Sequence, residues 1–433
     1  MQVNRAAARA GAAGLLLVPL LASCSGEGSA PPVAAVAITP ANAGAVQPDT
    51  SVTVQATKGK LQNVTVTDAA GRSVPGVLAA DGASWKSRYP LDPGARYAVA
   101  ATALGADGQV QTAESAFTTN KPSQTAAGTV EFPEAGETVG VGMPIKINFD
   151  REITDKAAVE RALEVRASQP VEGAWRWFDD KSVIFRTKDY WPAHTRIRLI
   201  GHLAGVQLAK GVYGAQNLDR SFRVGERIET VGSAKTHKVE VKVAGKKART
   251  MPASMGMGGA VKYMTTSGNH LTMEKEYMTV MTSPDAGPGQ PGYYQQNVYY
   301  TVRISNSGEY LHSAPWSVGS QGYANVSHGC INLSPDNAKW FHKISHRGDP
   351  VKIVGTERDL EPENGWGYWQ LDWKGWLKTS KAQGITTAAM DGSEHAPAKA
   401  EAAVQNKTPH KTQNKAPGVP AAPAVKQHGA GQP

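Results

Sequence analysis

Short strand-like runs separated by turn residues fill the first half of the chain, and they limit its fold more than any other feature. Apolar and polar residues alternate at 52–55 and 64–66, and glycine, proline and aspartate punctuate the chain between such runs. Alternation with a period of two predicts half-buried strands, and closely spaced turns predict a sandwich of two sheets. The 433 residues also exceed what one hydrophobic core usually holds, so we expect several domains.

The strand-rich half contains an internal repeat. The sequence Pro-Gly-Ala-Arg-Tyr-Ala-Val at 93–99 returns as Pro-Ala-His-Thr-Arg-Ile-Arg-Leu at 192–199. Self-similarity of this kind indicates a repeated structural unit. We predict two immunoglobulin-like β-sandwich modules, at residues 33–120 and 121–225, and keep one larger β domain as the alternative. Within the second module, only residues 157–165 have the apolar spacing of a helix.

A third region, residues 226–357, is also predicted to be mainly β. Valines at 239, 241 and 243 alternate with charged residues, which indicates a strand with one solvated face. One short helix is expected after Ser334, because serine is a favourable N-cap, Pro335 suits the first helical position and Asp336 complements the helix dipole. The predicted fold class is therefore mainly β in all three regions.

Aromatic residues crowd the segment at 358–380, where five lie close together: Trp366, Tyr368, Trp369, Trp373 and Trp376. They form either an exposed platform for sugars or a helical face, made of residues 369, 373 and 376, that clamps the segment against a neighbouring domain. We favour the clamp. Alanine, proline, glutamine and lysine prevail without periodicity at 381–433, which predicts a disordered tail.

The amino terminus predicts export. Two arginines precede an apolar run at 15–21 that is too short to span a bilayer, so residues 1–23 are expected to be a signal peptide. The Leu-Ala-Ser-Cys sequence ending at Cys24 resembles a bacterial lipobox, which implies a lipid on Cys24, a tether at 24–32 and a location at the outer face of the plasma membrane; an ordinary signal peptide is the alternative. In that compartment the net charge of +9 suits anionic wall polymers, and we expect no nucleic-acid partner.

A single unpaired thiol is the chemical centre of the sequence. The chain has two cysteines, so a lipid on Cys24 leaves Cys330 without a partner. His312 and His328 flank this thiol, and a nearby imidazole can take the proton that cysteine must lose before it attacks a carbonyl. Gly329 allows a sharp turn that presents backbone N–H groups to an oxyanion, and the helix expected just downstream favours negative charge at its start.

Two blocks carry a resemblance to a known family. His-Ser-Ala-Pro-Trp-Ser at 312–317 and Ser-His-Gly-Cys-Ile-Asn at 327–332 resemble the signature of the L,D-transpeptidases. The resemblance covers region 226–357, and the second module and the tryptophan-rich segment also resemble the companion parts of actinobacterial members. It implies these roles: Cys330 as nucleophile, His312 as general base, the Ser313 carbonyl as the group that orients it, His328 as an auxiliary, the Gly329 and Cys330 N–H groups with the Tyr294 hydroxyl as an oxyanion hole, and Trp316, Ser327 and Asn332 as pocket residues.

The resemblance also implies a reaction on peptidoglycan. Cys330 attacks the carbonyl after the third residue of a donor tetrapeptide stem, expels D-alanine and forms a thioester, which the side-chain amine of diaminopimelate on an acceptor stem resolves into a 3→3 cross-link. Water in place of that amine makes the enzyme an L,D-carboxypeptidase, and this alternative stays open. A non-catalytic wall-binding lipoprotein and a zinc site of His312, His328 and Cys330 are the weaker rivals. We expect no cofactor and a monomer.

Overall fold

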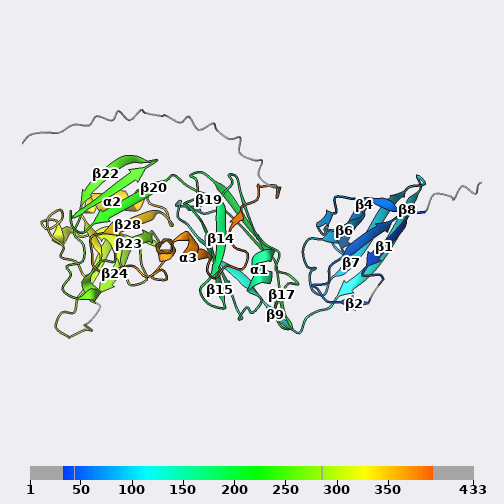
Figure 1. Ribbon diagram of the computed structural model, residues 1–433. Helices are drawn as coiled ribbons and strands as arrows, with labels where there is room; N and C mark the ends of the chain where they lie inside the picture. Colours follow the sequence, from blue (N-terminus) through cyan, green and yellow to red (C-terminus); the bar gives the residue numbers. More distant parts are fainter. Residues whose placement is uncertain (1–32, 43, 284–285, 394–433) are drawn as a thin grey trace, which may run out of the picture. The chain divides into compact units, whose positions relative to one another are not determined.

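The structure is a computed structural model that describes residues 33–42, 44–283 and 286–393. The predicted signal peptide, Cys24, the tether and residues 394–433 of the predicted tail lie outside the described residues. Strands dominate the described chain (Figure 1), which confirms the predicted mainly-β fold class. Among the described residues, no helix is both long enough and apolar enough to cross a membrane.

The first module consists of two four-stranded sheets. In sheet order, the first contains β1 (Ala35–Thr39), β3 (Thr53–Thr57), β6 (Ser84–Ser87) and β5 (Gly76–Leu78). The second contains β2 (Ala45–Val46), β8 (Val110–Thr119), β7 (Arg96–Gly105) and β4 (Gly59–Asp68). The inward-facing residues of both sheets form one core, in which Val54 and Trp85 from the first sheet join Tyr97 and Phe117 from the second. Every residue of this core lies between positions 36 and 117.

The second module repeats the arrangement with more elements. Its larger sheet contains β10 (Gly128–Phe132), β12 (Ile145–Phe149), β15 (Ser182–Thr187), β14 (Glu172–Trp177) and β29 (Ile385–Thr386). The facing sheet contains β11 (Thr138–Val139), β19 (Leu218–Val224), β16 (Arg196–Gly201) and β13 (Leu163–Ala167). A small third sheet contains β17 (Gln207–Ala209), β18 (Val212–Gly214) and β9 (Gln124–Ala126).

Two predictions about the second module need correction. The helix expected at 157–165 is α1 (Lys156–Ala162), and it stops early because Leu163 begins β13, which pairs with β16. The predicted tail begins too early, because β29 pairs with β14 and Thr387 N donates to the Val171 carbonyl at 2.9 Å. Chain beyond residue 381 is thus part of the ordered body. The predicted domain boundaries themselves stay predictions.

The third region holds two further sheets and a helix. One sheet contains β22 (Lys246–Pro252), β21 (Lys238–Val243), β20 (Ile228–Ser233), β28 (Pro350–Val354) and β23 (Gly268–Leu271). The other contains β24 (Lys275–Thr282), β25 (Gln295–Arg303), β26 (Tyr310–Ser313) and β27 (Ile331–Leu333). Short 3-10 turns occur at η1 (Val261–Tyr263) and η2 (Pro315–Ser317).

The patterns seen in this region predicted its elements well. On β21, Val239 and Val241 are buried whereas Lys238 and Lys242 face solvent, as the alternation requires. The helix expected after Ser334 is α2 (Pro335–Ile344). Phe341 of α2 packs with apolar residues of both sheets in a separate core. The strands that carry the candidate site, β26 and β27, thus share one core with the other sheet and α2.

The tryptophan-rich segment is a clamp, as favoured from its spacing. The segment forms two short helices, η3 (Gly367–Gln370) and α3 (Trp373–Leu377), where one continuous helical face was expected. The second helix starts separately because the Asp372 side chain caps it by accepting from Gly375 N. The Trp376 side chain is fully buried, and its Nε1 donates to the Ala174 carbonyl of β14 at 2.9 Å. A ring sealed inside a core offers no surface to a sugar, so the platform interpretation is wrong for Trp376.

Candidate active site

Strand pairing brings the two sequence blocks together. β26 and β27 are adjacent parallel strands, with His312 opposite Asn332 in the register, and Cys330 directly precedes β27. The connection between the two neighbouring strands includes the fourteen residues that separate His312 from the start of the second block. The nucleophile and base predicted from sequence lie at one edge of one sheet.

The Cys330 thiol is held in its protonated form. The residue keeps part of its surface in contact with solvent, and Sγ donates to the Gly308 carbonyl at 3.6 Å. Burial raises the pKa of the thiol to about 12, and the nearby Glu309 carboxylate raises it further. The Tyr310 backbone lowers this pKa but does not outweigh burial, and the expectation that the start of α2 favours a thiolate stays a prediction.

His312 is held as a neutral imidazole. Its side chain is almost completely buried, and burial lowers its pKa to about 4. Its Nδ1 lies 2.9 Å from the Ser313 carbonyl, which can only accept, so Nδ1 carries the proton and Nε2 presents a lone pair. The sequence hypothesis that Ser313 orients this ring through its carbonyl agrees with this contact. Within the described chain, no hydrogen bond joins Cys330 to His312.

The turn at 327–330 is fixed by its own hydrogen bonds. Gly329 has a φ of +128°, which favours glycine, and its N–H donates to the Ser327 hydroxyl at 3.1 Å. The same hydroxyl donates to the Cys330 carbonyl at 2.6 Å. The prediction that the Gly329 N–H faces an oxyanion is therefore wrong in this conformation, because a side chain within the same turn already accepts from it. Ser327 ties the turn together.

Asn332 is also a structural residue. It is 3% exposed, its Nδ2 donates to the Ser317 hydroxyl at 3.0 Å, and its backbone pairs with that of Ser254. These contacts connect the nucleophile strand to the η2 turn that follows His312. Asn332 and Ser327, which were both expected in the pocket, thus shape the site from within.

Aromatic rings form the accessible wall of the site. Trp316 is 51% exposed and stacks against the His312 ring at 6.0 Å between centroids. His328 is exposed and lies between Tyr294, which stacks on it at 5.6 Å, and Tyr263, which meets it edge-on at 4.9 Å. His328 accordingly belongs to the wall, together with the rings of Trp316, Tyr294 and Tyr263.

Several site residues escaped sequence reasoning. Tyr263 comes from η1, and Thr265, whose hydroxyl donates to the Gly329 carbonyl at 2.7 Å, follows it. Both lie more than sixty positions before the motif they contact, so no local pattern marks them. Glu309 is near His312 in sequence, but nothing in its type or spacing shows that it is buried. The described residues contain no group of three His, Cys, Asp or Glu side chains placed to bind a metal.

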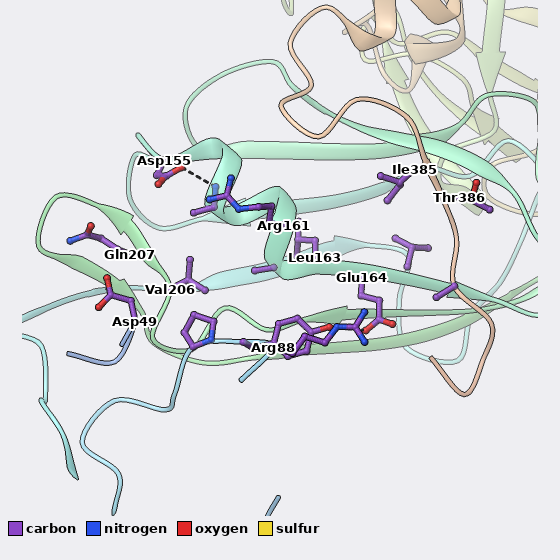
Figure 2. A pocket seen from close by; sticks show the side chains of 16 residues that line it. Asp49, Arg88, Asp155, Arg161, Leu163, Glu164, Val206, Gln207, Ile385 and Thr386 are labelled. Atoms are coloured by element: carbon purple, nitrogen blue, oxygen red, sulfur yellow. Dashed lines mark hydrogen bonds between the residues drawn. The ribbon is translucent and has the colours of Figure 1, made fainter. Parts of the chain in front are cut away.

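A large pocket of the molecule lies outside this site. Figure 2 shows that α1, β13 and β29 contribute to its lining, and that Asp155 caps α1 with a hydrogen bond from Ala158 N at 2.9 Å. None of its lining residues belongs to region 226–357. Its position therefore gives it no part in the chemistry of Cys330.

Comparisons with known proteins agree with the geometry. A family model described as the L,D-transpeptidase catalytic domain matches residues 230–353, and one described as a bacterial Ig domain matches residues 43–207. Over 331 residues the chain is 36% identical to L,D-transpeptidase 2 of Mycobacterium tuberculosis, spanning 76% of this chain and 80% of that protein. The chain belongs to the L,D-transpeptidase family.

Other relatives carry the same description. The enzyme is 34% identical over 380 residues to L,D-transpeptidase 5 of M. tuberculosis, which covers 85% of this chain and 83% of that protein. A solved L,D-transpeptidase from Mycobacterium smegmatis is 38% identical and covers 52% of this chain and 97% of its own, with a TM-score of 0.43. Another, LdtMt1 in complex with imipenem, is 37% identical and covers 54% and 100%, with a TM-score of 0.45. This L,D-transpeptidase is thus an acyltransferase that cross-links peptidoglycan.

Proposed function

We propose that this L,D-transpeptidase makes 3→3 cross-links between tetrapeptide stems through a thioester on Cys330. The observation that carries the proposal is the pairing of β26 with β27, which places Cys330 at the start of the strand next to the one that holds His312, a neutral imidazole whose Nδ1–H donates to the Ser313 carbonyl. An imidazole with a bare Nε2 is ready to accept a proton. A thiol with a raised pKa needs such a base at the moment of attack.

Acylation follows from these two groups. Sγ attacks the carbonyl carbon after the third stem residue, the S–C bond forms, and the thiol proton passes to Nε2 of His312. The C–N bond to the terminal D-alanine then breaks, and His312 returns the proton to the departing amine. The Cys330 N–H and the Tyr294 hydroxyl are the proposed donors to the oxyanion, since the Gly329 N–H is already bonded to Ser327.

Deacylation reverses the roles with a second stem. The side-chain amine of diaminopimelate attacks the thioester carbonyl, loses a proton to His312, and forms the new amide as the C–S bond breaks. The thiolate recovers its proton and the enzyme is regenerated. The aromatic wall of Trp316, Tyr294 and Tyr263 is the proposed place where the acceptor is held and water is kept away.

The division of labour between the two histidines has a direct test. Replacing the general base slows acylation by about 10²- to 10⁴-fold, so His312→Ala should fall in that range. His328→Ala should retain more activity, because His328 is exposed in the aromatic wall. If His328→Ala were the slower variant, the assignments of base and auxiliary would have to be exchanged.

The reaction itself is tested by intact-mass spectrometry of the enzyme incubated with a tetrapeptide muropeptide. The proposal expects a thioester adduct, free D-alanine and a dimeric product, all absent in Cys330→Ser. Free D-alanine and a tripeptide without dimer would instead identify an L,D-carboxypeptidase. If the folded enzyme released no D-alanine and formed no dimer, both the transpeptidase and the carboxypeptidase activity would be contradicted.

We also propose that a lipid on Cys24 anchors a monomeric enzyme at the outer face of the plasma membrane, where it meets its stems. The Leu-Ala-Ser-Cys sequence supports this proposal. Cys24→Ala should move the protein out of the membrane fraction. A variant that still sediments with membranes in high salt would contradict the anchor.

A further inference from the structure

A buried carboxylate lies beside the nucleophile and has no part in the reaction described above. Glu309, the residue before β26, is 3% exposed. Its Oε1 accepts from Thr266 N at 2.5 Å and its Oε2 accepts from the Thr266 hydroxyl at 2.7 Å. Its own N–H donates to the Ser305 hydroxyl at 3.1 Å. Glu309 is therefore held in two ways: its backbone bonds within its own loop, and its carboxylate bonds to the chain after η1.

A buried histidine completes this cluster. His270 of β23 is fully buried, and its Nε2 lies 2.8 Å from the Thr266 hydroxyl and 3.8 Å from Oε2 of Glu309. The Thr266 hydroxyl gives its proton to Oε2 of Glu309, so it accepts from Nε2 of His270, whose Nδ1 has no hydrogen-bond partner within the described chain. Burial alone would raise the pKa of Glu309, but the interactions with His270 and the hydrogen bonds from Ser305 and Thr266 together outweigh it and lower that pKa. Glu309 is therefore an anion inside the protein.

The same loop holds the Cys330 thiol. Gly308 supplies the carbonyl that accepts from Sγ, and the Tyr310 backbone also bonds to the thiol. Beneath the nucleophile turn, a methyl group added to Gly329 would come within 3.9 Å of Glu309 Cγ. The residues on either side of Glu309 thus cradle the sulfur while its side chain supports the turn from below.

We propose that Glu309 is a positioning residue, whose anchored carboxylate fixes the loop at 308–310 under Cys330 and keeps the resting nucleophile a neutral thiol. This proposal rests on Cys330 being the nucleophile. A fixed negative charge opposes a second one on sulfur, and the thiol is less reactive than the thiolate toward oxidants and alkylating agents. The proton then leaves only when a bound carbonyl draws it to His312.

The charges around this pair are few in the described chain. Glu309 faces His270 from β23, the Cys330 thiol, and Glu361 from the segment after β28, with which it interacts electrostatically. Cys330 faces Glu309 and Tyr310 and has His312 on the neighbouring strand. Glu309 is thus the carboxylate whose removal should be felt at the sulfur.

The test measures the thiol without any substrate. In full-length protein carrying Cys24→Ala, Cys330 is the sole thiol, and its rate of alkylation by iodoacetamide is followed against pH. Glu309→Gln keeps the shape and removes the charge, so alkylation near neutral pH should rise about tenfold as the midpoint moves to lower pH. Glu240→Gln, a half-buried acid on β21 that pairs with Lys247, is the matched control and should alkylate like the parent.

The second readout separates positioning from chemistry. Glu309→Gln should also lower kcat of transpeptidation with little change in KM, since the loop under the sulfur is loosened. An unchanged alkylation profile in folded Glu309→Gln overturns the proposal, even if activity falls. Should this variant not fold, Thr266→Val, which keeps the charge and removes the hydroxyl that anchors it, must alter the profile, and an unchanged profile overturns the proposal equally. Loss of transpeptidation in the parent, with normal alkylation, would instead contradict the proposed function.

Discussion

The two immunoglobulin-like modules share a pattern of strands but differ in what their cores contain. The first module closes on itself, since all of its core residues lie between positions 36 and 117. The core of the second also includes Leu271 and Met273 from the catalytic region and Trp366 and Trp376 from the clamp. The difference teaches that repetition in sequence does not imply equivalence in use, because the core of the second module extends into the catalytic region and the clamp whereas the core of the first is confined to its own residues.

Backbone contacts and a buried cation make this body continuous. Gly140 N donates to the Arg347 carbonyl at 2.7 Å, and Gly142 N to that of Gly348 at 2.9 Å. The Arg186 guanidinium lies 4.5 Å from the Trp369 ring and 4.7 Å from the Trp376 ring. Burial lowers its pKa to about 10, so it stays charged at neutral pH and its charge is met by rings and carbonyls.

Removing one tryptophan from each of the two cores gives the largest expected contrast. Trp376→Ala should lower the free energy of unfolding of the enzyme body by about 4 kcal/mol, because it empties a fully buried site and removes a hydrogen bond. Trp85→Ala, the matched change in the first module, should unfold that module and leave turnover intact. Thermal unfolding and transpeptidation at one temperature measure both. Equal loss of activity in the two variants would break the comparison.

A fall in pH should next distinguish the stability of the enzyme body from that of the first module. Burial lowers the pKa of His312 to about 4, so the folded body binds fewer protons than the unfolded chain, and its stability falls as pH drops from 6.5 toward 4. The loss attributable to His312 is on the order of 3 kcal/mol at most. Residues 33–120 contain no histidine, so the first module should not respond in this way.

The acid effect is measured as the difference in unfolding free energy between the parent and His312→Asn. His342 and His346 also have pKa values lowered by burial and add to the trend, whereas burial raises the pKa of Asp349 and opposes it. The difference between the two proteins cancels these shared contributions. A difference that does not change with pH would contradict a buried neutral His312.

A single methyl group added at Gly140, where the second module bonds to the catalytic region, should sharpen the comparison. A Cβ on Gly140 would collide with the backbone N and the carboxylate of Asp349, and the backbone cannot move aside cheaply. Gly140→Ala should therefore cost about 2 kcal/mol of body stability. Gly44→Ala, where nothing lies within 4 Å, should leave stability unchanged as the control. Denaturant unfolding measures both, and equal stabilities would show that the junction yields easily.

The smallest expected effect comes from the largest change. Deleting residues 33–120 removes the first module with its own core and should leave kcat/KM on soluble muropeptides within about twofold, because that core contributes no residue to the site. Circular dichroism confirms folding of the shortened protein. A large loss of turnover in a folded truncation would mean that the first module does more than extend the enzyme from its anchor.

Much of this organisation could be predicted because the relevant signals are local. Alternation identified β21, the Ser-Pro-Asp sequence identified the start of α2, and the tryptophan spacing identified the clamp. The end of α1 was missed because pairing with β16 draws Leu163 into a strand, which no local propensity records.

The site divides in the same way. The two motif blocks sufficed to expect Cys330 near His312. They did not predict which group accepts from the Gly329 N–H, because the Ser327 hydroxyl lies within the same turn and takes this hydrogen bond. Glu309 and Thr266 meet across 43 positions, so their contact depends on the packing of η1 and β23 against the loop before β26. Hydrogen-bond competition and long-range packing are what the sequence leaves undetermined.

The central claim is that Cys330 is the acyl-accepting nucleophile, and a covalent trap tests it most directly. A carbapenem is a strained cyclic amide whose opening by a thiol is downhill, so it should trap a thiol nucleophile as a covalent adduct. After exposure to a carbapenem, intact-mass spectrometry with peptide mapping should find one adduct per chain, on Cys330, and none in Cys330→Ser. An adduct on another residue, or an equal adduct in the serine variant, would contradict the account.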